Sequence, residues 1–152
     1  MLSIGDIAPE FELKDQTGNM VSLSQLTDAG DLILYFYPAD FSPVCTAEAC
    51  VFRDSYEGIA DIGAQIIGIS PQSVSSHLRF SNTFSIPFPL LADERKRVIR
   101  AYGVDGPLGF GVRRATYLID NKRVIKNRVV SDLLVNSHLD LIKETLRKNQ
   151  SA

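Results

Sequence analysis

The chain contains only two cysteines, Cys45 and Cys50, and they lie five positions apart. Two cysteines are too few for the disulfide framework that staples small secreted domains. The N-terminal residues lack the basic and long apolar segments of a secretory signal, so we expect a cytoplasmic location, where thiols stay reduced. There, a close pair of thiols is typical of redox chemistry or metal binding rather than of a structural role.

The pattern around Cys45 predicts that this residue lies at the start of a helix. From 43 to 62 the apolar residues follow one helix face: Cys45, Ala49, Phe52, Tyr56 and Ile59. Ser42 stands before Pro43 and is predicted to cap the helix. Unpaired backbone N–H groups at a helix start stabilise a thiolate relative to a thiol, so the position of Cys45 predicts a nucleophile. The alternative is that Cys45 is a small buried hydrophobe on the apolar face.

The spacing between the two cysteines limits how they can pair. In an intact helix, residues five apart differ by about 140° in direction and about 7.5 Å in rise, so their Cα atoms lie roughly 8.6 Å apart. A disulfide needs a Cα separation below about 7 Å. Either the two cysteines never pair, with Cys50 a spectator on the helix side, or the helix start unwinds when they do.

Several separate segments of the chain resemble the peroxiredoxins. Residues 36–50, FYPADFSPVCTAEAC, are similar to the active-site segment of that family, which runs proline, three residues, threonine or serine, two residues, cysteine. A second cysteine five residues later resembles the bacterioferritin comigratory protein branch, also called peroxiredoxin Q. Residues 5–11, 88–93, 102–104 and 114–120 match further family motifs in the right order, so the resemblance spans nearly the whole chain.

The resemblance implies roles for five residues. Cys45 matches the peroxidatic cysteine, and Cys50 matches the resolving cysteine. Ser42 matches the hydroxyl that contacts the peroxide; the family more often has threonine there, and serine lacks the methyl group that restricts the threonine rotamer. Pro38 matches the proline that shields the thiolate, and Arg114 matches the active-site arginine.

Two neighbouring arginines compete for the predicted site. On a strand, Arg114 and Thr116 point one way while Arg113 points the other, so only one arginine can face the site. The spacing of the family motif selects Arg114. The alternative is that both arginines are solvated charges at a strand end.

Three other ionisable residues are expected to be structural. Glu48 follows the family pattern, but its simplest role is that of an acidic residue in the first helical turn, favoured by the helix dipole. His77 shares a helix face with aromatic residues, and His138 begins the final helix. Neither histidine has a ligand-like partner nearby in the sequence, so we expect no metal site.

The resemblance implies a thiol-dependent peroxidase that reduces hydrogen peroxide and organic hydroperoxides without a cofactor. Cys45 would attack the peroxide and become a sulfenic acid, Cys50 would form a disulfide with it, and thioredoxin or a similar dithiol protein would reduce that disulfide. Two alternatives keep the same fold. A protein disulfide oxidoreductase normally carries C-x-x-C, whereas four residues separate these cysteines. A non-catalytic redox sensor would use the cysteine switch to alter a partner surface.

The remaining pattern predicts a single α/β domain over 1–152 with a thioredoxin-like fold. A turn-rich stretch between two short strands within 11–23 predicts an N-terminal hairpin extension. Helices alternate with buried strands and a hairpin follows, which is typical of a mixed sheet flanked by helices. The expected strands are 32–37, 65–70, 116–119 and 124–130, and the expected helices are 43–62, 73–84, 93–102 (capped by Asp93) and 137–148.

Charge and composition narrow the range of partners. The formal net charge is −2 and the pI is about 5.6, so no basic excess indicates nucleic-acid binding. The longest apolar run, 32–37, is far shorter than the ~20 residues that span a membrane. We expect neither a nucleic-acid partner nor a membrane partner, and the sequence leaves a monomer and a homodimer open.

Overall fold

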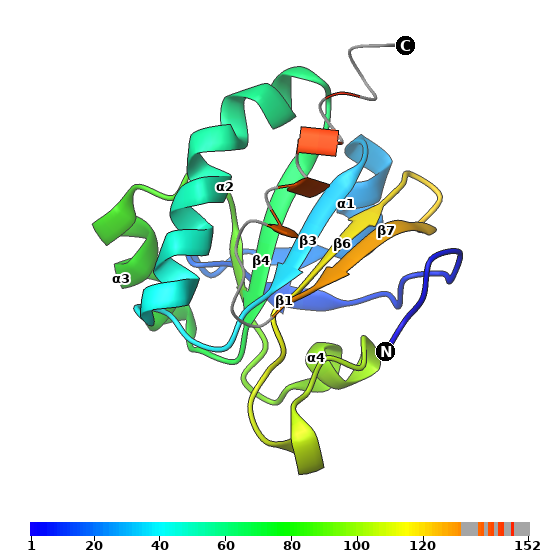
Figure 1. The fold of residues 1–152 in the computed structure, drawn as a ribbon. Helices are drawn as coiled ribbons and strands as arrows, with labels where there is room; N and C mark the ends of the chain where they lie inside the picture. Colours follow the sequence, from blue (N-terminus) through cyan, green and yellow to red (C-terminus); the bar gives the residue numbers. More distant parts are fainter. Residues whose placement is uncertain (132–136, 139, 142, 145–146, 148–152) are drawn as a thin grey trace.

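The structure is a computed structural model that describes residues 1–131, 137, 138, 140, 141, 143, 144 and 147. Within these residues, seven strands form one sheet in the order β2-β1-β5-β4-β3-β6-β7. The strands are β1 (Glu12–Lys14), β2 (Met20–Ser22), β3 (Leu32–Phe36), β4 (Gln65–Ser70), β5 (Leu90–Ala92), β6 (Ala115–Ile119) and β7 (Ile125–Val130). The helices are α1 (Leu23–Ala29), α2 (Pro43–Asp61), α3 (Val74–Phe84) and α4 (Arg97–Ala101). Figure 1 shows α2 and α3 together on one side of the sheet.

The middle of the sheet is buried on both faces, as the continuous apolar runs of β3 and β4 predict. β3 pairs in parallel with β4 and antiparallel with β6, so the sheet is mixed. Alternation along β3 sends Leu34 and Phe36 into one apolar cluster, with α1 and α4 residues, and Ile33 and Tyr35 into another, with α2 and α3 residues. The prediction of a mixed sheet with helices on its faces is confirmed.

The N-terminal hairpin is formed by β1 and β2. The Asp15 side chain accepts hydrogen bonds from the backbone N–H groups of Thr17 and Asn19 and closes the turn. Lys14 of β1 pairs with Ala92 of β5, so the hairpin adds two strands to one edge of the sheet. The hairpin extension is therefore present where the sequence predicts it.

Helix α2 begins at Pro43 and is continuous through both cysteines to Asp61. Ser42 has extended backbone and occupies the N-cap position, but the predicted side-chain cap is wrong. The Ser42 hydroxyl donates instead to the Ala39 carbonyl at 3.2 Å, because the tight turn before the helix brings that carbonyl within reach. The first-turn N–H groups of α2 are thus left without a Ser42 side-chain acceptor.

The helix expected at 93–102 is shorter than predicted, and its cap differs. It starts at Arg97, and Lys96 holds the N-cap position with a left-handed backbone. Asp93 lies before the helix, at the end of β5. Its carboxylate accepts a hydrogen bond from the backbone N–H of Ile99 at 2.8 Å, and this bond connects the end of β5 to α4. The glycine-rich loop over 103–111 contains the short 3₁₀ turn Pro107–Gly109.

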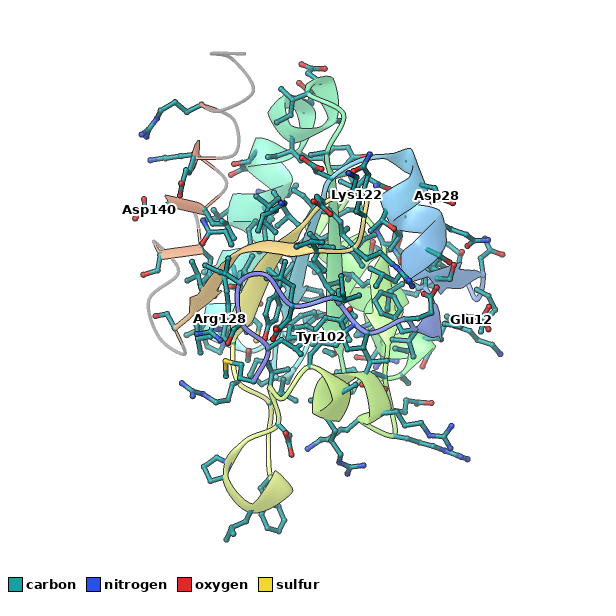
Figure 2. All side chains as sticks on the ribbon, turned by 90° about the vertical axis from the view of Figure 1, so that its right-hand side faces the viewer. Glu12, Asp28, Tyr102, Lys122, Arg128 and Asp140 are labelled. Atoms are coloured by element: carbon teal, nitrogen blue, oxygen red, sulfur yellow. The ribbon has the colours of Figure 1, made fainter. Side chains whose placement is uncertain are left out.

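The final helix is described only in part. Ser137, His138, Asp140 and Leu141 are helical, as are residues 143, 144 and 147. Leu139, Ile142 and Leu146, whose spacing predicts the inner face of this helix, lie outside the described residues. In the part of the chain that the structure describes, no helix is both long and apolar enough to cross a membrane. Figure 2 shows Tyr102 within the packed layers and Glu12, Asp28 and Asp140 at their margins.

Candidate active site

Cys45 lies in the first turn of α2 and is buried, with 1% of its surface exposed. Its sulfur accepts a hydrogen bond from Arg114 Nη2 at 3.1 Å. The guanidinium donor and the N-terminal end of the helix both place positive charge beside this sulfur. The structure thus joins two residues that the sequence analysis placed in one site.

Arg114 reaches Cys45 because of the strand order. Ala115 of β6 pairs with Phe36 at the end of β3, where the chain turns toward α2, so the residue before Ala115 lies beside the helix start. Both arginines line one hollow, but Arg114 is buried, with 3% exposure, and donates to the Cys45 sulfur, whereas Arg113 is half-buried. Of the two arginines, Arg114 is therefore the one that contacts the cysteine.

Glu48 is not the first-turn residue favoured by the helix dipole that the sequence suggested, because it lies beyond the first turn of α2. It is fully buried, and its Oε1 accepts a hydrogen bond from Arg114 Nη1 at 2.9 Å. It follows Cys45 by three positions, so both side chains lie on the same buried face of α2. Burial raises the pKa of Glu48 to about 7, against the lowering effect of Arg114. The i, i+3 spacing from Cys45 was the available signal for this site residue.

His138 also belongs to the site, although the sequence analysis found no partner for it. Its Nδ1 lies 2.6 Å from Thr116 Oγ1 and 3.6 Å from Glu48 Oε2, and its Nε2 lies 3.0 Å from the Ser131 carbonyl oxygen. The side chain is completely buried. Because His138 lies far along the chain from Glu48, local sequence patterns carried no signal for this contact.

Pro38 and Ser42 border the site from the loop between β3 and α2. Pro38 and Arg114 line a hollow of about 460 Å³ whose rim is the 106–113 loop. Ser42 is half-buried, and its hydroxyl is directed at Ala39 as described above. The hollow gives a small molecule access to Arg114, whose guanidinium contacts the buried sulfur of Cys45.

A buried cluster of Tyr37, Asp40, Ser76 and His77 anchors the chain just before α2. Asp40 accepts hydrogen bonds from the Tyr37 and Ser76 hydroxyls, each at 2.7 Å, and its Oδ2 lies 2.7 Å from His77 Nδ1. Burial works to raise the pKa of Asp40, but the His77 contact and the other hydrogen bonds lower it. His77 is thus a buried histidine held by hydrogen bonds. Its partner Asp40 comes from a loop 37 positions away.

Phe41, next to this cluster, has a left-handed backbone with φ of 67°. Its ring packs against Phe80 and Phe84 of α3, with ring centroids 5.2 and 6.2 Å away. A bulky residue adopts that conformation only where its surroundings hold it there. The residues that lead into α2 are thus held in place by the hydrogen bonds of Asp40 and by the ring contacts of Phe41.

Cys50 lies in the same unbroken helix as Cys45 and is half-buried. Both cysteines are free thiols. Helix geometry keeps their Cα atoms roughly 8.6 Å apart, beyond the ~7 Å that a disulfide allows. The structure is therefore the reduced form, and the pair can join only if the helix start changes shape.

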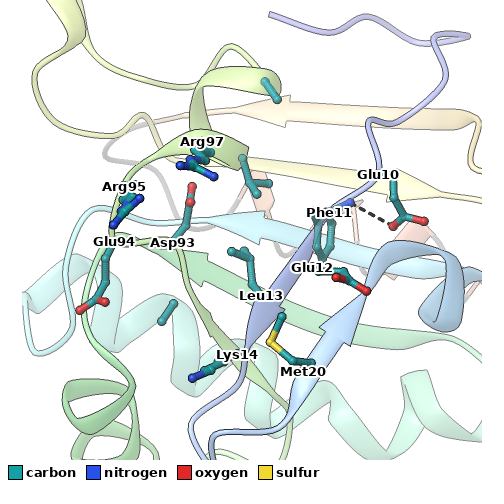
Figure 3. A pocket seen from close by; sticks show the side chains of 13 residues that line it. Glu10, Phe11, Glu12, Leu13, Lys14, Met20, Asp93, Glu94, Arg95 and Arg97 are labelled. Atoms are coloured by element: carbon teal, nitrogen blue, oxygen red, sulfur yellow. Dashed lines mark hydrogen bonds between the residues drawn. The ribbon is translucent and has the colours of Figure 1, made fainter.

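A larger hollow, of about 760 Å³, lies between the N-terminal hairpin and the 92–101 segment (Figure 3). Its lining mixes apolar side chains such as Phe11 and Met20 with both acidic and basic ones. None of the five candidate site residues lines it. The candidate residues Pro38 and Arg114 line the smaller hollow instead.

A soft sulfur nucleophile held against a fixed cation suits attack on a weak, uncharged bond that releases an anion. Peroxides have such a bond. Together with the mixed sheet and its hairpin extension, this arrangement defines the class of thiol peroxidases that have a thioredoxin-like fold.

Comparison with known proteins gives the family. The AhpC/TSA family model matches residues 4–128, and the chain belongs to this family. It is 46% identical over 127 residues to a chloroplastic peroxiredoxin Q of Triticum aestivum, covering 82% of this chain and 58% of that protein. It is 40% identical over 153 residues to chloroplastic peroxiredoxin Q of Gentiana triflora, covering 99% of this chain and 68% of that protein.

A solved structure supports the same assignment. Peroxidoxin BcpB from Mycobacterium tuberculosis superposes with a TM-score of 0.90 at 37% identity, covering 97% of this chain and 98% of that chain. The predicted thioredoxin-like α/β fold and the peroxiredoxin Q branch are thereby confirmed. The plant relatives are named as chloroplastic. The cytoplasmic location and the single domain over 1–152 stay predictions.

Proposed function

We propose that Cys45 reduces hydrogen peroxide and organic hydroperoxides as the peroxidatic cysteine of this peroxiredoxin. The Cys45 thiolate attacks one peroxide oxygen, a sulfur–oxygen bond forms, and the oxygen–oxygen bond breaks. The sulfur becomes a sulfenic acid, and the departing alkoxide or hydroxide takes up a proton to leave as an alcohol or water. The hydrogen bond from Arg114 to the Cys45 sulfur is the single observation that best supports this step.

The groups around Cys45 supply the cradle for the peroxide. Arg114 and the unpaired N–H groups of the first α2 turn favour the negative charge that develops on the leaving oxygen. The Ser42 hydroxyl joins them by turning from Ala39 toward the substrate. Pro38 lines the same hollow as Arg114 and limits the access of water to the thiolate.

Cys50 then resolves the sulfenic acid. Its sulfur attacks Cys45, a disulfide forms, and water is released. Because the intact helix holds the two residues too far apart, this step includes unwinding of the first turns of α2. A thioredoxin-like dithiol protein reduces the disulfide, and the helix re-forms. The cycle therefore requires a reducing compartment such as the cytoplasm.

Two cysteine variants test this cycle. Cys45→Ser should abolish peroxide consumption, and Cys50→Ser should consume one equivalent of peroxide rapidly but lose sustained turnover with thioredoxin and its reductase. Mass spectrometry of dimedone-treated Cys50→Ser should place the adduct on Cys45. Full steady-state activity in Cys45→Ser would end the proposal.

The two alternative functions give different results in the same assays. A protein disulfide oxidoreductase would reduce insulin with dithiothreitol at rates comparable to a thioredoxin. A sensor without a substrate cradle would react with hydrogen peroxide near the rate of a free cysteine. The buried Arg114 contact favours peroxidase chemistry over both.

A further inference from the structure

A continuous chain of buried polar contacts leads from Cys45 to the last helix. Arg114 donates through Nη2 to the Cys45 sulfur and through Nη1 to Glu48 Oε1, so one guanidinium holds two acidic groups. The other carboxylate oxygen, Oε2, lies 3.6 Å from His138 Nδ1. His138 is in turn fixed by Thr116 and Ser131.

The surroundings of the His138 ring determine where its protons can be. Nε2 faces a backbone carbonyl, which can only accept, so Nε2 carries a proton in either charge state. Nδ1 faces the Thr116 hydroxyl and the Glu48 carboxylate. An additional proton on the imidazole would therefore lie at Nδ1, on the side of Glu48.

A proton on His138 Nδ1 would stabilise the buried carboxylate of Glu48. Among the described residues, its buried Oε2 has no hydrogen-bond partner, and an unpaired buried carboxylate oxygen is costly. Burial alone raises the pKa of Glu48, which would protonate it near neutral pH. A cationic imidazole within ion-pair distance opposes this effect by stabilising the ionised carboxylate.

The ionisable groups that surround Glu48 come from four segments. Cys45 shares α2 with it, Arg114 precedes β6, Tyr35 lies on β3, and His138 is in the last helix. Burial, followed by the negative charges of Glu48 and Cys45, raises the pKa of Tyr35 well above its usual value, so this phenol stays neutral. With an ionised thiol, an ionised Glu48 and Arg114, the buried group carries one net negative charge, which a proton on His138 cancels.

We propose that His138 is a positioning residue for the peroxidase reaction: it accepts the proton of Glu48, so that a Glu48 carboxylate holds the Arg114 fork against the Cys45 sulfur. The proton moves from the Glu48 carboxyl to His138 Nδ1, leaving a carboxylate and an imidazolium. This inference rests on the proposed function, because it assigns a role around the same nucleophile.

The test follows Cys45 oxidation in single turnover. With Cys50→Ser as the parent, the rate of thiol loss with hydrogen peroxide is measured from pH 5.5 to 8.5. In His138→Gln, no imidazole can accept the proton of Glu48. We therefore expect a new step near pH 7 in the pH profile of the rate, with the rate at pH 6 several-fold below that of the parent. Glu48→Gln should react slowly, and its pH profile should lack that step. Adding His138→Gln to Glu48→Gln should change the rate less than twofold.

Controls separate a proton effect from loss of packing. Asp140→Asn removes an exposed charge from the same helix and should follow the parent profile. Identical profiles for the parent and His138→Gln, or an equal effect of His138→Gln in the Glu48→Gln background, overturn the role of His138. A parent that reacts no faster than free cysteine overturns the proposed function and this inference together.

A second measurement observes the His138 ring directly in the unmodified protein. In unmodified reduced protein, nitrogen-15 NMR of the His138 ring should show an imidazolium at pH 6.5, with both nitrogens protonated. A neutral ring at that pH, together with an infrared carbonyl band that Glu48→Gln removes, shows a protonated Glu48 and overturns the proposal.

Discussion

Arg114 donates to the sulfur of Cys45 at 3.1 Å, although 69 positions separate the two residues in the chain. The antiparallel pairing of β6 with β3 brings the start of β6 to the place where β3 leads into α2. The contact between Arg114 and Cys45 is therefore a product of sheet order, because it needs β6 to pair with β3 beside the start of α2.

Replacing Arg114 by lysine should keep the charge but lose the two-pronged hydrogen bonding to Cys45 and Glu48. We expect the rate constant for Cys45 oxidation to fall about 100-fold, the usual loss when one preorganised donor is removed. Stopped-flow competition with a reference peroxidase measures it. Arg79→Lys, an exposed exchange on α3, serves as the matched control and should react like the parent. A loss below threefold in Arg114→Lys would show that charge alone suffices.

Oxidation of Cys45 by one equivalent of peroxide should unwind the start of α2. We expect backbone amides within 43–50 to exchange hydrogen faster in the disulfide form than in the reduced form, while those of β3 and β4 stay protected. Hydrogen-exchange mass spectrometry measures both. Peroxide-treated Cys45→Ser is the control and should keep the reduced pattern. Unchanged protection over 43–50 in a protein with a verified Cys45–Cys50 disulfide contradicts the unwinding step.

The Ser42 hydroxyl must leave Ala39 to reach a peroxide. Ser42→Ala should slow Cys45 oxidation about tenfold, the value of one hydrogen bond in the transition state. Ser42→Thr should react faster than the parent, because the extra methyl group restricts the rotamer of the hydroxyl. The same stopped-flow assay ranks the three proteins. Equal rates in all three would remove Ser42 from the cradle.

Asp40 should contribute stability with a distinct pH dependence. Its pKa is lowered in the folded state, so this contribution is present above the unfolded value near 3.8 and is lost as the pH falls through the folded value. Asp40→Asn breaks a buried pair, and we expect a loss of about 3 kcal/mol at pH 7 that shrinks toward pH 3. Urea unfolding measures it, with the exposed Asp28→Asn as the control. A pH-independent loss would contradict the ionic character of the Asp40 cluster.

The parts of the site that could be predicted depend on local patterns. Cys45 was predicted at a helix start because a buried strand, a proline and a helical repeat follow one another in the sequence. Strand alternation and the family motif separated Arg114 from Arg113, and the structure places Arg114 on the cysteine. These signals act within a few residues, where backbone geometry is regular.

The parts that were missed depend on tertiary contacts. Glu48 was interpreted as an acidic first-turn residue favoured by the helix dipole, yet it lies on the buried face with Cys45 and pairs with Arg114. The partners of His77 and His138 come from distant segments. The helix expected from Asp93 starts only at Arg97, although the Asp93 carboxylate accepts the N–H of Ile99 in its first turn.

Because the start of α2 is unbroken, the exposed residues of its first turns also bear on the over-oxidation of Cys45. A Cys45 sulfenic acid that waits for Cys50 is exposed to a second peroxide, which converts it to sulfinic acid. On the proposed cycle, the waiting time is set by how often the first turns open. Ala47 is exposed in those turns and touches no reacting group, yet a glycine there lowers helix stability by about 1 kcal/mol. Tolerance of this enzyme to excess oxidant is thus a property of helix propensity at its surface, which selection can adjust without altering a single residue of the catalytic cradle.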